Sequence, residues 1–260
     1  MQRTMLITGG THNTGYAIAR RFAQEGYRVG LTSRSKERAE EAAQRLSKET
    51  GAFCCGYQLS MTDPTEIEDV FTRADAELKG VSAFVGNSAN LGVDIDLLTA
   101  TPQQYDEVMD VNIKGNYFCC QQAARIMRRD GGGSIVLMGS VHYREAIWGR
   151  SLYAASKGAL ASLVRSMAYE LGIYGIRANC VIAGAIRTER WDTMTPEQVA
   201  ARRKNWPIGV ESTGEDIANA VYFLGSEQSK TITGTDLTVD SGVTICLLPF
   251  EGGKQIKGGK

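Results

Sequence analysis

The chain alternates short apolar runs with longer amphipathic stretches from end to end. The apolar runs lack the in-out alternation of a strand with one wet face, which is typical of strands covered by helices on both sides. They predict seven strands, at 4–8, 28–33, 52–59, 82–87, 134–140, 177–182 and 236–240. Strand–helix alternation of this kind favours right-handed crossovers. We therefore expect an α/β fold with a doubly wound, Rossmann-like parallel sheet of seven strands.

The helical stretches between these runs begin with recognisable caps. "DPTE" at 63–66 places an Asp cap before a Pro at the first helical position and a Glu three residues after the cap. "TPQQ" at 101–104 and "TPEQ" at 195–198 repeat the device with Thr. Neither a Pro-, Ser- or Gly-rich linker nor an internal repeat interrupts the pattern. We expect a single domain over 1–249, followed by a flexible Gly- and Lys-rich tail at 250–260.

Composition narrows the class of protein. The 260 residues carry a formal net charge of zero, so no basic excess favours nucleic acid or an anionic membrane as partner. Apolar runs fall short of the roughly 18–20 residues that span a bilayer, and no signal peptide is recognisable, which predicts a cytoplasmic protein. The six cysteines show no metal-ligand spacing. We expect no metal site and buried, structural thiols.

A glycine-rich turn follows the first predicted strand and opens the first helix. It reads "TGGTHNTG" at 8–15. Glycines at this place let the backbone approach a pyrophosphate, and the helix N-terminus supplies amide donors and a positive dipole. The turn therefore predicts a dinucleotide site with contacts from Gly9, Thr11, His12, Asn13 and Gly15.

The residues at the end of the second predicted strand indicate which dinucleotide the site binds. Proteins that bind NAD place an acidic residue there for the ribose hydroxyls. This chain has Ser33, Arg34 and Ser35, with no acid before Glu37. Arg34 can pair with a 2′-phosphate, and the serines and His12 can donate hydrogen bonds. The pattern favours NADP(H) over NAD(H); the alternative is that Arg34 is a solvated surface residue.

"SLYAASKGAL" at 151–160 places a phenol and an ammonium on one helix face. Tyr153 and Lys157 are four residues apart, one helical turn. The spacing also fits a half-buried tyrosine beside a lysine whose stem reaches to water. The meaning of the pair therefore depends on what the rest of the chain places around it.

Several further motifs follow in a fixed order, and together they resemble the short-chain dehydrogenase/reductase family over essentially the whole chain. After the glycine turn come "NSAN" (87–90), "DVNIKGNYF" (110–118), "MGSV" (138–141), "YAASK" (153–157), "NCVIAGAIRT" (179–188) and "TGTDLTVDSG" (233–242). The resemblance implies a catalytic tetrad of Asn112, Ser140, Tyr153 and Lys157. It also implies a homotetramer, in which the apolar stretches 117–127 and 159–171 pair between subunits.

The resemblance implies further cofactor contacts beyond the glycine turn and the second strand. They fall at Ser60, Met61, Asn87, Ala89, Lys157, Gly184, Ile186 and Thr188. Four features depart from the family pattern. The family's "NNAG" is "NSAN" at 87–90, which keeps Asn87 but alters its neighbours. Asn13 replaces the middle glycine of the turn, Ser60 replaces an Asp near the adenine, and Ala183 replaces a proline before Gly184. Asn tolerates left-handed backbone, so we expect the turn to keep its shape.

The tetrad suits carbonyl reduction, in which a hydride reaches carbon and a proton reaches oxygen. Tyr153 is the expected acid, although a free phenol has a pKa near about 10. A cation about 4–5 Å away would stabilise the phenolate by roughly 3–4 kcal/mol at an effective dielectric constant near 20, so we expect Lys157 to lower the Tyr153 pKa. Ser140 would donate a hydrogen bond to the substrate oxygen. In the family the Asn equivalent to Asn112 interrupts a helix and anchors a water that relays protons through the lysine.

Two segments are expected to surround the substrate, the loop 141–152 and the covering segment 185–206. We expect substrate contacts from His142, Trp148, Arg187 and Trp191. The arginines of the covering segment, Arg190 among them, favour a small polar carbonyl or alcohol such as a sugar, polyol or hydroxy acid, unless they form a solvated face.

Two alternative functions stay open. A 3-oxoacyl-thioester (acyl-carrier-protein) reductase would use a basic docking surface, to which Arg128 and Arg129 could contribute, although Tyr174 lies where another arginine is wanted. A non-catalytic NADP-sensing regulator would keep the fold, but such proteins typically lack the Tyr/Lys pair that this chain retains.

Overall fold

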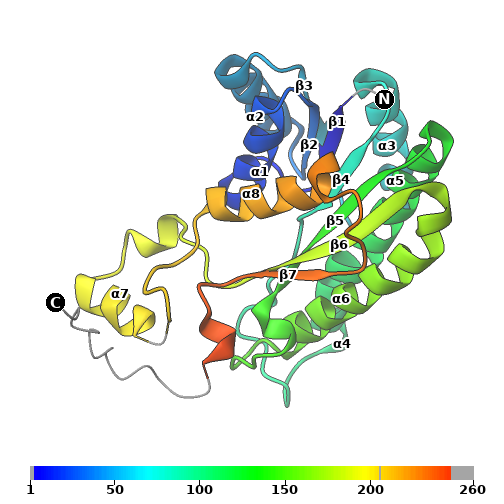
Figure 1. Cartoon of the computed structure of the whole chain (residues 1–260). Coiled ribbons are helices and arrows are strands. Elements are labelled where there is room, and N and C mark those ends of the chain that lie inside the picture. Colours follow the sequence, from blue (N-terminus) through cyan, green and yellow to red (C-terminus); the bar gives the residue numbers. More distant parts are fainter. Residues whose placement is uncertain (1–2, 205, 247–260) are drawn as a thin grey trace.

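Seven parallel strands form one sheet in the computed structural model, which describes residues 3–204 and 206–246 (Figure 1). The strand order is β3-β2-β1-β4-β5-β6-β7. The strands are β1 (Thr4–Ile7), β2 (Arg28–Ser33), β3 (Cys54–Gln58), β4 (Ala83–Gly86), β5 (Gly133–Ser140), β6 (Ile176–Ala183) and β7 (Asp236–Val239). Each end lies within two residues of the predicted one, and the predicted fold class is confirmed.

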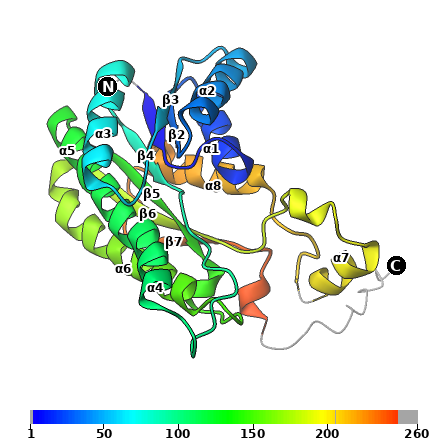
Figure 2. The same ribbon diagram turned by 180° about the vertical axis from the view of Figure 1, so that it is seen from behind.

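Helices cover both faces of the sheet (Figures 1 and 2). One layer contains α1 (Asn13–Gln24), α2 (Lys36–Thr50) and α8 (Gly214–Gly225), and the other contains α3 (Pro64–Leu78), α5 (Asn116–Asp130) and α6 (Ser151–Leu171). A π-helical segment, Asp110–Gly115, joins the short helix α4 (Pro102–Met109) to α5. A second short helix, α7 (Pro196–Arg203), lies away from the sheet (Figure 1).

The side chains of each strand alternate between the two helical layers. Leu6 and Phe84 belong to the core under α3, α5 and α6, whereas Met5, Ile7 and Val85 belong to the core under α1, α2 and α8. All five are fully buried. Burial on both sides explains why the strand sequences are apolar without alternation.

The predicted helix caps are present. The Asp63 side chain accepts hydrogen bonds from the amides of Thr65 and Glu66. Thr101 and Thr195 each form a reciprocal capping box at the start of α4 and α7. Local sequence therefore sets these helix boundaries.

The prediction of buried thiols is only half right. Cys119, Cys120 and Cys180 are buried, but the remaining three, Cys54, Cys55 and Cys246, are partly exposed. Cys54 and Cys55 lie on β3, an edge strand that has a strand neighbour on one side only. All six thiols are free, and no cluster of potential metal ligands occurs among the described residues.

Among the described residues, no helix has the length and apolarity needed to cross a membrane. The predicted tail at 250–260 lies outside the described residues.

The sheet creates the site where its strand order reverses. The chain leaves β1 towards α1 on one face and β4 towards the opposite face, so a crevice opens beyond their carboxyl ends. Asn87, directly after β4, spans the two exits, because its Nδ2 donates to the carbonyls of Thr8 (3.1 Å) and Gly9 (3.0 Å).

Replacing Gly15 by alanine should disturb this crevice. A Cβ at Gly15 would overlap the backbone carbonyl of Gly9 and press on the side-chain amide of Asn87, which is itself bonded to the Thr8 and Gly9 carbonyls. We expect Gly15→Ala to lower the free energy of unfolding by about 1–3 kcal/mol.

The matched control is Gly158→Ala, because a Cβ there meets nothing within 4 Å and the position lies inside α6. This control should raise stability by about 0.5–1 kcal/mol. Chemical denaturation of both variants measures the difference, and equal stability of Gly15→Ala and the parent protein would contradict the packing described.

Candidate active site

A cleft of about 1530 Å³ runs along the carboxyl ends of the strands. It joins the glycine turn and the end of β2 to the first turns of α6. Most of the residues predicted for the cofactor and the reaction line it: Gly9, Thr11, His12, Asn13, Gly15, Ser33, Arg34, Ser35, Ser60, Met61, Asn87, Ala89, Ser140, Tyr153, Lys157, Gly184 and Ile186. Two predicted residues, Asn112 and Thr188, are not part of this lining.

The glycine turn has the backbone that the sequence predicted. Gly9 has φ +66° and Asn13 has φ +46°, so the asparagine occupies the left-handed region in place of the family's glycine. The helix α1 begins after His12 without a side-chain cap and without an acidic residue in its first turn. Its first amides are therefore left for an anionic ligand at the cleft, and the turn fits the pyrophosphate of a dinucleotide.

The end of β2 presents cations and hydroxyls to the same cleft. Arg34 is exposed there, and Ser33 Oγ accepts from the Ser35 amide at 3.3 Å, which leaves its own proton free to donate. The Ser35 hydroxyl is engaged in capping α2, since it accepts from the Arg38 amide (3.2 Å) and donates to Glu37 (2.8 Å). Ser35 is therefore a poorer phosphate donor than the sequence suggested.

Two cleft-lining arginines were missed by the sequence analysis. Arg38 and Arg45 lie on α2 and line the cleft beside Arg34. Arg45 also reaches the glycine turn, where its Nη2 donates to the Thr11 carbonyl at 3.2 Å. The signal was available, because residues seven apart on a helix share a face and α2 follows the cofactor strand directly.

Asn112 lies inside the protein and not on the cleft surface. It is fully buried within the π-helical segment, so the expected interruption of the helix is present. Its Oδ1 accepts from the Asn90 amide (2.6 Å), and its Nδ2 donates to the Asn90 carbonyl (2.9 Å) and to Ser156 Oγ (2.9 Å). The side chain thus ties the loop after β4 to α6, and its expected role in a water relay stays a prediction.

Tyr153, Ser140 and Lys157 come together at the floor of the cleft. All three are largely buried, with exposed fractions of 9%, 6% and 3%. Lys157 Nζ lies 5.4 Å from the Tyr153 ring centroid and donates to the Met138 carbonyl at 2.6 Å. An ammonium has three donors, so two remain beyond this bond for groups at the cleft, which fits ribose hydroxyls.

The expected lowering of the Tyr153 pKa by Lys157 is wrong for the protein on its own. Burial raises the Tyr153 pKa, and a hydrogen bond from Ser140 and the charge of Arg150 only partly offset this effect. Burial also lowers the pKa of Lys157 to about 8. The physical reason is desolvation: both groups lie in low dielectric, and the ammonium is bound to a backbone carbonyl.

The residues predicted to contact substrate lie apart from the cleft lining. His142 is nearest, with its ring centroid 6.2 Å from that of Tyr153, and its Nδ1 lies 3.3 Å from the Glu145 carbonyl oxygen. Trp148 is 89% exposed. Thr188, which was predicted to contact the cofactor rather than the substrate, also lies outside this lining and precedes the short helical turn Glu189–Trp191.

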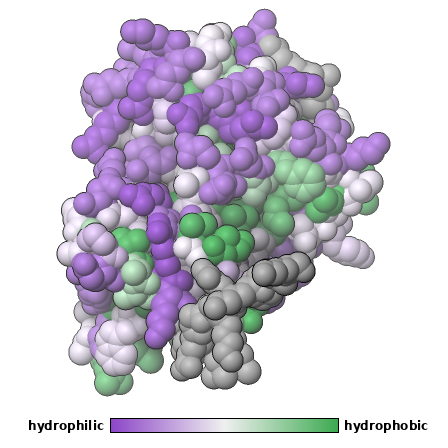
Figure 3. Space-filling model, turned by 60° about the vertical axis from the view of Figure 1, so that its left-hand side comes forward, coloured by the Kyte–Doolittle hydropathy of each residue, from purple (hydrophilic) through white to green (hydrophobic). Residues whose placement is uncertain are grey.

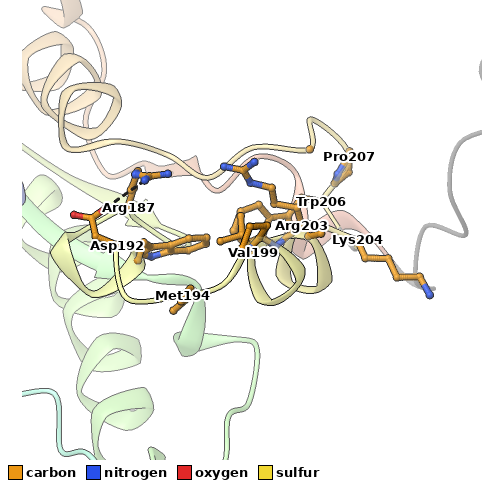
Figure 4. Close-up of a pocket in the computed structure, with 12 residues that line it drawn as sticks. Arg187, Asp192, Met194, Val199, Arg203, Lys204, Trp206 and Pro207 are labelled. Atoms are coloured by element: carbon orange, nitrogen blue, oxygen red, sulfur yellow. Dashed lines mark hydrogen bonds and ion pairs between the residues drawn. The ribbon is translucent and has the colours of Figure 1, made fainter.

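The covering segment borders a second, shallow and open pocket of about 880 Å³ (Figure 4). Trp191 is buried against Trp206, with ring centroids 5.9 Å apart. Figure 4 shows Arg187 paired with Asp192, and the same guanidinium binds the buried Glu211 at 3.0 Å. Figure 3 shows apolar surface on the side of the molecule that carries α7. Ile208, which follows α7 in the sequence, is 71% exposed.

The arginines of this segment are therefore largely engaged within the protein. Arg203 also binds Glu211, at 2.7 Å and 2.8 Å. The interpretation of Arg187 as a reader of substrate carboxylates loses its support, because two acids already neutralise it. The side chain of Arg190 lies outside what the structure describes.

Comparisons with known proteins agree with this geometry. A family model described as enoyl-(acyl carrier protein) reductase matches residues 10–244. The chain is 31% identical over 244 residues to the 3-oxoacyl-(acyl-carrier-protein) reductase FabG of Staphylococcus aureus, covering 94% of this chain and 98% of that protein. It is 30% identical over 242 residues to the 3alpha-hydroxysteroid dehydrogenase of Mediterraneibacter gnavus, covering 92% and 95%.

A solved structure gives the same result. A short-chain type dehydrogenase/reductase from Mycobacterium marinum superposes with a TM-score of 0.83 at 26% identity, covering 93% of this chain and 95% of that one. The chain therefore belongs to the short-chain dehydrogenase/reductase family of nicotinamide-dependent oxidoreductases.

Proposed function

We propose that this protein is an NADP(H)-dependent oxidoreductase that interconverts a small-molecule carbonyl and its secondary alcohol. The observation that carries the proposal is the placement of Tyr153, Ser140 and Lys157 on one floor of a cleft whose other end is the glycine turn. A proton donor and a dinucleotide site in one cleft are what hydride transfer to a carbonyl requires.

The side chains divide the chemistry between them. NADPH, when bound, supplies the hydride that reaches the carbonyl carbon. Tyr153 gives its hydroxyl proton to the carbonyl oxygen, and Ser140 donates a hydrogen bond that holds this oxygen and stabilises its developing charge. An ordinary phenol is already protonated at neutral pH. Burial raises the Tyr153 pKa further, so the hydroxyl carries the proton that the reaction needs but is a weaker acid than a free phenol. Lys157 holds the ribose hydroxyls with the donors that Met138 leaves free.

The charge at the adenine end supports NADP(H) over NAD(H). Arg34, Arg38 and Arg45 line this part of the cleft, and Glu41 is the acidic side chain among the described lining residues. Arg45 is 4.0 Å from Glu49, which leaves Arg34 and Arg38 as the cations for a 2′-phosphate.

The substrate is proposed only as a carbonyl class. The small polar carbonyl expected from the arginine-rich covering segment has less support, since Glu211 and Asp192 neutralise Arg187 and Arg203. A 3-oxoacyl thioester is the second candidate, favoured by the match to FabG over 98% of that protein. Against it, Arg129 is bound by Asp75 and Asp130 and so offers little charge for carrier docking.

Two measurements test the proposed oxidoreductase function: oxidation of NADPH by the protein, and the loss of this activity when the Tyr153 hydroxyl is removed. We expect oxidation of NADPH with some members of a panel of polar ketones, hydroxy ketones and a 3-oxoacyl thioester, followed by absorbance. Tyr153→Phe should lower kcat by about 10²–10⁴-fold because the general acid is lost, with the Kd for NADPH nearly unchanged.

Tyr169→Phe is the matched control, since this tyrosine is on the same helix and 88% exposed. Full activity of Tyr153→Phe would show that the acid is misassigned. NADPH binding without oxidation across the whole panel would favour the sensing regulator.

The preference for NADPH over NADH tests whether Arg34 binds the 2′-phosphate. Arg34→Asp replaces an attractive charge by one that repels a 2′-phosphate, and should shift the ratio of kcat/KM for NADPH over NADH by at least about tenfold towards NADH. Lys36→Asp makes the same charge change two residues away at an exposed position that does not line the cleft. An equal shift in both variants, or none in Arg34→Asp, would contradict direct recognition.

We propose a homotetramer on the basis of the outer faces of α5 and α6. These helices expose Tyr117 (48%) and Tyr169 (88%), and Ile173 directly after α6 is 81% exposed. Light scattering should give four times the chain mass of 28.2 kDa. Tyr169→Glu should reduce this mass if the face is buried between subunits, and a monomeric parent protein would overturn the proposal.

A further inference from the structure

The N-terminus of α6 carries an unusual charge arrangement three residues before the catalytic phenol. Arg150 occupies the N-cap position, no side chain caps the helix, and the first turn holds no acidic residue. A cation at a helix N-terminus opposes the helix dipole and costs stability. In contrast, α2, α3, α7 and α8 each begin with a capping side chain and at least one acidic residue in the first turn.

The Arg150 side chain is held in place by the loop after β4. Its Nη1 donates to the Leu91 carbonyl at 2.7 Å, and Leu91 lines the cleft. The backbones also meet, because Ile95 bridges to Arg150 and its amide donates to the Gly149 carbonyl at 3.3 Å. Arg150 forms no ion pair with any acidic side chain in residues 3–204 and 206–246. Its charge is thus fixed in position and not neutralised by a described partner.

The other titratable groups around Tyr153 do not supply an equivalent charge. Lys157 is bound to the Met138 carbonyl and titrates with a pKa of about 8 because it is buried. His142 presents its ring 6.2 Å from the phenol ring. A guanidinium keeps its charge throughout this range. Arg150 therefore provides the cation that persists when Lys157 is neutral, and its charge favours the phenolate.

We propose that Arg150 is a positioning residue for Tyr153, which fixes the Leu91 loop against the start of α6 and holds a permanent positive charge at the helix end that carries the phenol. The inference rests on the proposed role of Tyr153 as the acid. It assigns Arg150 to the reaction side of the site and gives a role to a cation placed where it opposes the helix dipole.

The test is a direct titration of Tyr153, which requires no substrate. Phenolate absorbance is read within milliseconds of a jump to alkaline pH, before unfolding, and the signal of the same protein carrying Tyr153→Phe is subtracted. The subtraction isolates Tyr153 from the other nine of the ten tyrosines. Arg150→Met removes the charge, Arg150→Gln is a second neutral variant in case the first does not fold, and Arg150→Lys keeps the charge.

We expect both neutral variants to raise the Tyr153 titration midpoint by about half a pH unit to one pH unit, and Arg150→Lys to restore it. Arg144→Met is the matched control, because Arg144 is an exposed cation on the same loop whose guanidinium lies 4.8 Å from the Tyr143 ring centroid. It should leave the Tyr153 midpoint unchanged.

An unchanged midpoint in the neutral variants would overturn the inference, as would an equal rise in Arg150→Lys or in Arg144→Met. The result is separable from the proposed function. A normal Arg150 effect in a protein that never oxidises NADPH would overturn the function alone, whereas turnover without an Arg150 effect would overturn only this inference.

Discussion

The burial of the Lys157 ammonium is the constraint on which the site depends. A charge in low dielectric is costly unless it is hydrogen-bonded, and the described partner is a single backbone carbonyl, that of Met138 on β5. This bond fixes α6 against the sheet and orients the face that carries Tyr153. The two remaining donors make the ammonium incompletely satisfied, so a ligand with hydroxyl groups stabilises it. The same burial that positions the phenol also raises its pKa, which makes Tyr153 a weaker acid than a free phenol.

A chain of hydrogen bonds connects the backbone of Tyr153 to segments far apart in the sequence. Asn112 binds the backbone of Asn90 and the hydroxyl of Ser156, and Ser156 in turn donates to the Tyr153 carbonyl at 2.7 Å. The π-helical segment is what turns Asn112 into this position, and π-bulges are frequent at functional sites for such reasons. Two side chains therefore hold the loop after β4 against the start of α6. Asn112 bonds to Asn90 and Ser156 inside the protein, and Arg150 bonds to Leu91 at the helix end.

The sequence predicted those parts of the structure that local physics determines. Apolar runs located every strand to within two residues, and the Asp and Thr caps marked the starts of α3, α4 and α7. Most of the cofactor cleft followed as well, because the glycine turn and the end of β2 are local features. The predictions that were wrong concern properties that depend on residues distant in the sequence. The exposure of Cys54 depends on β3 being an edge strand, and the engagement of Arg187 depends on Glu211, which is distant in the sequence. The direction of the Tyr153 pKa shift depends on whether desolvation, which raises the pKa, outweighs the nearby positive charge, which lowers it. The spacing of two residues on a helix does not give this balance.

Among the α-helices that begin after non-helical residues, α1 and α6 start with neither a side-chain cap nor an acidic residue in the first turn. The start of α1 lines the cleft at the glycine turn, and the first turn of α6 contributes Tyr153 to the same lining. Uncapped amides and an uncompensated dipole destabilise a helix, so this arrangement works against folding at both places. It works for an anionic dinucleotide at α1 and for a developing phenolate at α6. The fold thus concentrates unsatisfied positive potential at the two points where the proposed reaction brings negative charge, and caps the remaining exposed helix starts in the ordinary way.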